Sequence, residues 1–208
     1  MKYRHPVTPT ETESPAIKLI RSHLKTPHSP VYINSAPLSG AEVDNCFPTV
    51  EEYVRVNGGS RILGWSIWEL PGIYVEAEFH AIWKSNAGEL LDITPKKQPT
   101  RRILFLRDEL TPYEGYQVNN LRVPIKRDPV VVAFLQACEN EFEFSNRGDR
   151  RGMHGEIALS GAAAMEYSEI MQEKMIALME VMRITPSVGA YSPCKCGSGL
   201  KTKWCCKM

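Results

Sequence analysis

Four of the six cysteines lie within thirteen residues near the end of the chain, with a spacing that could bind a metal ion. They are Cys194, Cys196, Cys205 and Cys206. Two pairs are joined by eight residues, and four thiolates can surround one Zn²⁺ as a tetrahedron. With all four positions filled by protein, the zinc would be structural and not catalytic. The alternative is a redox-active cluster, but a segment this short has no core, so metal binding would supply most of its folding energy.

The residues around these cysteines resemble a known zinc motif. Residues 193–203 read Pro-Cys-Lys-Cys-Gly-Ser-Gly-Leu-Lys-Thr-Lys, which is similar to the SEC-C motif, the zinc-binding tail of the bacterial preprotein translocase ATPase. The resemblance implies that residues 193–208 form a small zinc-binding unit. Because the motif docks a chaperone in its namesake, it also implies a protein partner for the tail, and it says little about the main activity.

A cysteine, a histidine and an aspartate elsewhere in the chain could together perform thiol chemistry. Cys46 stands immediately before a predicted helix, and backbone N–H groups at a helix start favour a thiolate. His80 would accept the thiol proton, and Asp92 would hold the imidazole in the required tautomer. The backbone N–H of Cys46, with the side chain of Asn34 or Asn45, would face the oxyanion of the reacting carbonyl.

Strand periodicity brings His80 and Asp92 to one face of a predicted hairpin. His80 belongs to the less apolar face of the predicted strand 74–84, and turn residues follow, so that residues 89–93 return antiparallel. A loop at 85–87 would place Asp92 directly opposite His80, whereas a loop that starts one residue later would place it diagonally on the same face. Either register allows a carboxylate–imidazole hydrogen bond. We expect both side chains to face a groove.

The order and spacing of these three residues resemble the transglutaminase-like branch of the papain-like superfamily. In that branch a cysteine at a helix start is followed by a His-Ala strand and then by an Asp-x-Thr element, which Cys46, His80-Ala81 and Asp92-Ile93-Thr94 match. The resemblance covers about residues 31–107. It implies an α+β fold with a papain/transglutaminase-like antiparallel sheet, an N-terminal nucleophile helix and C-terminal helices. It also implies a cysteine protease, amidase or deamidase, or a cross-linking transferase, with a protein or peptide substrate.

Two other interpretations of these residues stay open. The three could be unrelated: a cysteine in a hydrophobic pocket, a surface histidine and an aspartate near a turn. The fold could also have lost its chemistry, and the chain would then be a non-catalytic zinc-containing adaptor that binds a protein or nucleic-acid partner. Cys138 lies in the apolar stripe of a predicted helix, so we interpret it as a small buried hydrophobe.

The predicted elements divide the chain into five parts. These are an N-terminal extension (1–30), the transglutaminase-like α+β domain (31–150), a long C-terminal helix (151–185), a linker (186–192) and the zinc-binding motif (193–208). Within the domain we expect helices over residues 47–56 and from residue 129 onward, and strands over residues 31–33, 61–70, 72–84, 89–93 and 103–107.

The composition is that of an ordinary globular protein. Hydrophobic residues make up 43% and charged residues 24%, which excludes a disordered chain and a disulfide-dense miniprotein. No apolar run approaches the length of a membrane-spanning helix, and the N-terminus lacks the apolar region of a signal peptide, so we expect a cytoplasmic protein with no membrane partner. The net charge is +1, but residues 192–208 carry four lysines and no acid, a weak indication of an anionic partner such as nucleic acid.

Overall fold

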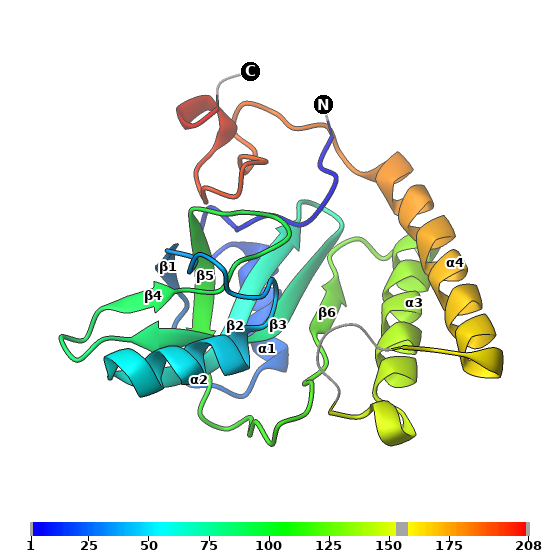
Figure 1. The fold of residues 1–208 in the computed structure, drawn as a ribbon. Helices are drawn as coiled ribbons and strands as arrows, with labels where there is room; N and C mark the ends of the chain where they lie inside the picture. Colours follow the sequence, from blue (N-terminus) through cyan, green and yellow to red (C-terminus); the bar gives the residue numbers. More distant parts are fainter. Residues whose placement is uncertain (1, 153–157, 207–208) are drawn as a thin grey trace.

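The computed structural model describes residues 2–152 and 158–206, and in these residues it confirms a mixed α+β fold (Figure 1). The α-helices are α1 (Pro15–His23), α2 (Cys46–Asn57), α3 (Pro129–Ser145) and α4 (Gly161–Ile184). The strands are β1 (Val31–Ser35), β2 (Ser60–Leu70), β3 (Tyr74–Lys84), β4 (Leu90–Asp92), β5 (Arg102–Arg107) and β6 (Leu121–Pro124). Short 3₁₀ helices cover Gly148–Arg150 and Thr202–Trp204.

The sheet curls until five of its strands close into a barrel. The strand order is β2-β5-β1-β4-β3-β6. β2 also pairs with β3, and this additional pairing closes the ring β2-β5-β1-β4-β3. β6 extends the free edge of β3 at residues 74–77. The antiparallel expectation holds for the other pairings, but β1 and β4 run parallel. Barrel closure and this parallel pair correct the expected antiparallel sheet. β1 and β4 can run parallel because the chain between them contains a helix and a long hairpin.

Closure of the barrel depends on a close backbone approach at Gly64. This residue of β2 pairs with His80 of β3 on one side and with Arg107 of β5 on the other. A Cβ atom at Gly64 would lie 2.3 Å from the carbonyl oxygen of Leu106 and 2.6 Å from the ring of Phe105. Only glycine therefore fits where β2 passes between its two neighbours.

Residues 2–30 are part of the packed body, which corrects the N-terminal extension expected over residues 1–30. Tyr3, Val7, Ile17 and Ile20 are fully or almost fully buried. Helix α1 begins after the Ser14 cap and packs its apolar face against β2, β3 and β5, behind the barrel in Figure 1. The short apolar stripe of this segment does not indicate how much barrel surface is available for it to pack against.

Helices α3 and α4 lie side by side next to the barrel (Figure 1). The Asp128 side chain caps α3 and Pro129 follows at its first position, as the sequence indicates. The long helix predicted over residues 151–185 is present as Gly161–Ile184; of the residues before it, 153–157 lie outside the described residues and 151, 152 and 158–160 are not helical. Across both described ranges, every helix is too short or too polar to cross a membrane.

The cysteine-rich tail rests on the N-terminal residues and on the start of β5 (Figure 1). The Tyr3 hydroxyl donates to the Pro193 carbonyl at 2.6 Å, and the Arg102 guanidinium donates to the Gly199 carbonyl at 2.7 Å. The Thr100 hydroxyl donates to the carbonyl of Gly197. The tail is thus attached to the body by three side chains that donate to its backbone.

Candidate functional site

Cys46 is the first residue of α2, as expected for a thiol at a helix start. The preceding Asn45 makes no side-chain cap, since its amide donates to Glu42 at 2.7 Å. The first backbone N–H groups of α2 are therefore not used by the capping residue. The helix holds Cys46 against the barrel by packing Val50 beside Ala81 and Ile93, in the same buried cluster as Cys46.

The loop before Cys46 is tied to the segment that follows Asp92. The backbone N–H of Leu38 donates to the Ile93 carbonyl at 2.9 Å, and that of Asp44 donates to the Pro95 carbonyl at 2.9 Å. Asp44 itself has φ of 58°, a left-handed conformation that aspartate tolerates better than most residues. These bonds fix the start of α2 relative to the end of β4.

His80 and Asp92 meet as the hairpin pattern predicted. Trp83 pairs with Leu91 in the β3–β4 ladder, which puts Asp92 one pair beyond and diagonal to His80 on the same face. This is the register with the later loop. The His80 Nε2 atom lies 2.9 Å from Asp92 Oδ1, so the predicted hydrogen bond is confirmed.

The two side chains are buried, which corrects the expectation that they face a groove. His80 is 3% exposed and Asp92 is 0% exposed, because barrel closure covers the face that a flat sheet would leave open. Lys96 joins them, with Nζ 2.6 Å from Asp92 Oδ2 and 3.5 Å from His80 Nε2. The sequence reasoning missed Lys96. The sequence shows that Lys96 is four positions after Asp92. However, no local sequence pattern predicts that this irregular segment folds back to bring Lys96 to Asp92.

The pKa values of this buried group depend on one another. Burial and the Lys96 ammonium lower the pKa of His80, but the side chains of Cys46 and Asp92 raise it, to about 10. Burial raises the pKa of Asp92, but His80 and Lys96 outweigh burial and lower it to about 2. The Glu78 carboxyl on β3 is also next to His80, and burial raises its pKa. With its pKa at about 10, the imidazole carries a second proton at neutral pH, beside an ionised carboxylate.

The hydrogen bond to Asp92 determines which nitrogen of His80 can react. Since Asp92 is an ionised acceptor, Nε2 carries the proton, and Nδ1 of the neutral ring is free to accept another. The Cys46 sulfur is near enough that its charge raises the pKa of His80. The arrangement can take a proton from the Cys46 thiol and return it to a leaving group.

A cavity of about 710 Å³ opens beside Cys46, between the start of α2, β3, β6 and the two C-terminal helices. Its lining includes Asn45 but not Asn34, which is exposed in β1, so only one of the two amides predicted near the oxyanion is at the cavity. Asn119 and Asn120 also line it and were missed, because the segment before β6 carries no pattern that predicts its position. Cys138 faces the same cavity, but burial raises its pKa.

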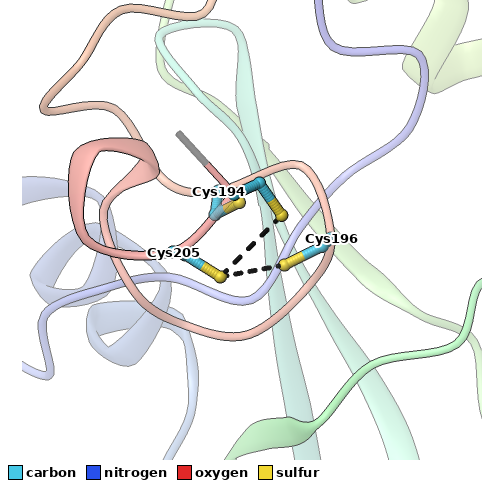
Figure 2. Close-up of side chains that lie close together, drawn as sticks. Cys194, Cys196 and Cys205 are labelled. Atoms are coloured by element: carbon cyan, nitrogen blue, oxygen red, sulfur yellow. Dashed lines mark hydrogen bonds between the residues drawn. The ribbon is translucent and has the colours of Figure 1, made fainter. Parts of the chain in front are cut away.

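The four C-terminal cysteines converge, as their spacing predicted (Figure 2). All four sulfur atoms lie within 4.8 Å of one another, with Cys196 and Cys205 separated by 3.4 Å and Cys205 and Cys206 by 3.9 Å. A tetrahedral site with Zn–S bonds of ~2.3 Å has sulfur atoms roughly 3.8 Å apart, so the cluster fits this metal. The Cys194 N–H donates to the Leu200 carbonyl at 2.7 Å and closes the turn that brings the pairs together.

Trp204 lies at the surface of the tail and does not fill this turn. Its side chain is 63% exposed and contacts the exposed ring of Tyr191 edge to face, with centroids 6.0 Å apart. Lys203 donates to the Tyr191 hydroxyl at 3.1 Å. The tail therefore presents an aromatic pair with a lysine at its edge.

Comparison of the chain with protein-family models, curated proteins and solved structures finds no match.

Proposed function

We propose that this protein is a cysteine-dependent acyl-transfer enzyme of the transglutaminase-like type, acting on an amide as a protease, amidase or deamidase. The observation that carries the proposal is the buried His80–Asp92 hydrogen bond, together with the electrostatic effect on His80 of Cys46, the first residue of α2. Burying a charged pair of this kind costs desolvation free energy. Buried ionisable groups with shifted pKa values cluster at functional sites, which favours a functional role for this pair.

In the proposed reaction the thiol proton of Cys46 first passes to Nδ1 of His80, and the sulfur then attacks the amide carbonyl carbon as a thiolate. The carbonyl π electrons move to the oxygen, and the uncapped N–H groups at the start of α2 stabilise that oxyanion. The imidazolium then gives its proton to the amine as the C–N bond breaks, which leaves a thioester on Cys46. Water attacks the thioester, loses a proton to His80 and releases the acid and the thiol. An amine in place of water would give transfer.

The cavity at Cys46 supports a peptide or another amide as substrate. Its volume is within the range of small-molecule sites, and its lining is largely polar, with the amides of Asn45, Asn119 and Asn120. Amide side chains can both donate to and accept from a peptide backbone. The substrate carbonyl would enter from this cavity, since Cys46 itself lines it.

We also propose that the tail is a SEC-C-type unit that binds one structural zinc ion through Cys194, Cys196, Cys205 and Cys206. Thiolate donors favour zinc over harder cations such as Mg²⁺, and four protein ligands leave no position for a reacting water. Bound zinc would hold the tail in the shape that contacts Tyr3 and Arg102.

The proposed enzyme is tested with p-nitrophenyl acetate, an activated acyl donor, added to the zinc-bound protein. We expect a burst of one p-nitrophenol per chain and a trapped acetyl group on Cys46, found by peptide mass spectrometry. Cys138→Ala is the matched control, because that thiol faces the same cavity, and it should keep the burst. Cys46→Ala should lose it. A burst that survives in Cys46→Ala would refute the proposal.

Thiol reactivity gives an independent test of the same assignment. Cys46 should be alkylated by iodoacetamide at pH 7 about tenfold faster than Cys138, since only Cys46 has a helix start and an imidazole beside it. His80→Ala should reduce that advantage. Equal, slow labelling of the two cysteines would favour the second candidate, a non-catalytic adaptor.

One observation favours the second candidate, a non-catalytic adaptor: the tail is rich in lysine and exposes the Tyr191–Trp204 aromatic pair. Aromatic rings and lysines together suit a nucleic-acid strand or an acidic protein segment. Trp204 fluorescence reports such binding directly. A change in emission on adding oligonucleotide or acidic peptide, absent in Lys203→Ala, would support this candidate, and an unchanged spectrum would count against it.

A further inference from the structure

Lys96 is the one ammonium placed against the buried His80–Asp92 pair among the described residues. Its side chain is 9% exposed, and Nζ lies 2.6 Å from Asp92 Oδ2 and 3.5 Å from the Thr94 carbonyl. The same atom is 3.5 Å from His80 Nε2. The two oxygens of one carboxylate are therefore divided between a lysine and a histidine.

We propose that Lys96 is a positioning residue for the Cys46–His80–Asp92 site: it binds the oxygen that His80 does not use and limits how firmly the carboxylate holds the imidazolium. This inference rests on the proposed function. It adds a fourth residue, with a role distinct from those of the other three.

The first part of the role is orientation. Asp92 Oδ1 accepts from His80 and, at 3.4 Å, from the Thr94 backbone N–H, and the Lys96 bond to Oδ2 holds the other oxygen, which keeps Oδ1 directed at Nε2. The ammonium has only donors, so it cannot replace Asp92 as the acceptor for the Nε2 proton. Lys96 thereby helps to keep Nε2 as the nitrogen bound to Asp92 and leaves Nδ1 as the nitrogen available for proton exchange.

The second part of the role is electrostatic. The titratable groups around His80 are Cys46, the carboxyls of Asp92 and Glu78, and the Lys96 ammonium. The Cys46 and Asp92 side chains both favour a buried imidazolium. The positive charge at 3.5 Å opposes them and makes it easier for His80 to give its proton to the leaving amine.

The backbone accounts for the position of Lys96. Lys96 is four positions after Asp92, and the Pro95 carbonyl between them accepts the Asp44 N–H at 2.9 Å. The segment is thus held to the loop that leads into Cys46. The next residue, Lys97, points outward with 82% of its side chain exposed and lies 3.8 Å from Asp44. It is a natural control, because it is a lysine of the same segment without the Asp92 contact.

The test is the pH profile of Cys46 alkylation, measured by rapid mixing and peptide mass spectrometry on the full zinc-bound chain. Lys96→Gln removes the charge but keeps an N–H donor for Asp92, so the buried carboxylate stays hydrogen-bonded. We expect the upper midpoint of the profile, where His80 loses its proton, to move up by about one pH unit or more in Lys96→Gln. Lys97→Gln and the charge-preserving Lys96→Arg should both keep the wild-type midpoint.

The outcomes separate the two proposals. An unchanged midpoint in folded Lys96→Gln, or an equal shift in Lys97→Gln, would overturn the role of Lys96 while Cys46 remained reactive. If Lys96→Gln fails to fold, Lys96→Arg decides, because a midpoint that differs from wild type in this charged variant would contradict the electrostatic part. Slow labelling of Cys46 in the wild-type protein would instead refute the proposed function.

Discussion

Replacement of Asp92 by asparagine should destabilise the protein because the carboxylate is the shared partner of two buried groups. Asp92 is 0% exposed and accepts from Lys96 at 2.6 Å and from His80 at 2.9 Å. Asparagine keeps the shape and one acceptor oxygen but removes the charge. Lys96 would then lose the carboxylate with which it pairs at 2.6 Å.

Two estimates give the size of this loss. Folding lowers the pKa of Asp92 from 3.8 to about 2, and a shift of that size corresponds to about 2.5 kcal/mol of stability at pH 7. Breaking a buried ion pair by removing one partner typically costs about 3–5 kcal/mol. Since the asparagine oxygen can still accept one hydrogen bond, we expect a loss of about 2–4 kcal/mol in the free energy of unfolding.

The assay is urea unfolding followed by tryptophan fluorescence, with zinc present throughout. The wild-type protein should lose the Asp92 contribution as pH falls from about 4 toward 2, because a depressed pKa stabilises only above the unfolded value. The difference between wild type and Asp92→Asn should therefore shrink over that range. Asp44→Asn is the control: Asp44 pairs with Lys97 at 3.8 Å on the surface and should change stability by less than about 0.5 kcal/mol.

A double variant sharpens the test. In Asp92→Asn/Lys96→Met no buried ammonium is left unpaired, so the double variant should be more stable than the sum of the two single losses predicts, by about 1 kcal/mol or more. A loss below about 0.5 kcal/mol in Asp92→Asn at pH 7 would refute the reasoning, since it would mean that neither charge depends on Asp92.

Three further outcomes follow from the fold. Folding raises the pKa of His80 from 6.5 to about 10, so its contribution to stability is full below pH 6.5 and should be lost as the pH rises through 10, which urea unfolding across that range measures; His80→Ala should flatten this dependence. Gly64→Ala should cost about 2 kcal/mol or more, because its Cβ would overlap a backbone carbonyl; Gly189→Ala, where the nearest atom would be 3.4 Å away, is the control in the same thermal-melting assay. Termination after Thr185 should remove all bound zinc, read by metal analysis, and should also lower the stability of the body by about 1 kcal/mol through the lost Tyr3 hydrogen bond, so metal retained by the shortened chain would contradict the site.

The sequence by itself determined the parts of this protein that depend on local spacing. The four C-terminal cysteines are close in sequence, and the short turn with two glycines between the two pairs brings them together. The His80–Asp92 hydrogen bond follows from strand alternation and a tight hairpin, both of which act within thirteen residues. The start of α2 at Cys46 and the cap of α3 at Asp128 were likewise visible as local signals.

Only the tertiary structure decided how these parts are enclosed. Barrel closure through Gly64 buries His80 and Asp92, and no periodicity within β3 distinguishes a closed sheet from an open one. Lys96 reaches Asp92 because distant loop residues hold its irregular segment. The N-terminal residues and the cavity beside Cys46 depend on surfaces contributed by elements far away in the chain. The stability of such long-range contacts depends on the total apolar area that they bury. A local sequence pattern carries no information about that area.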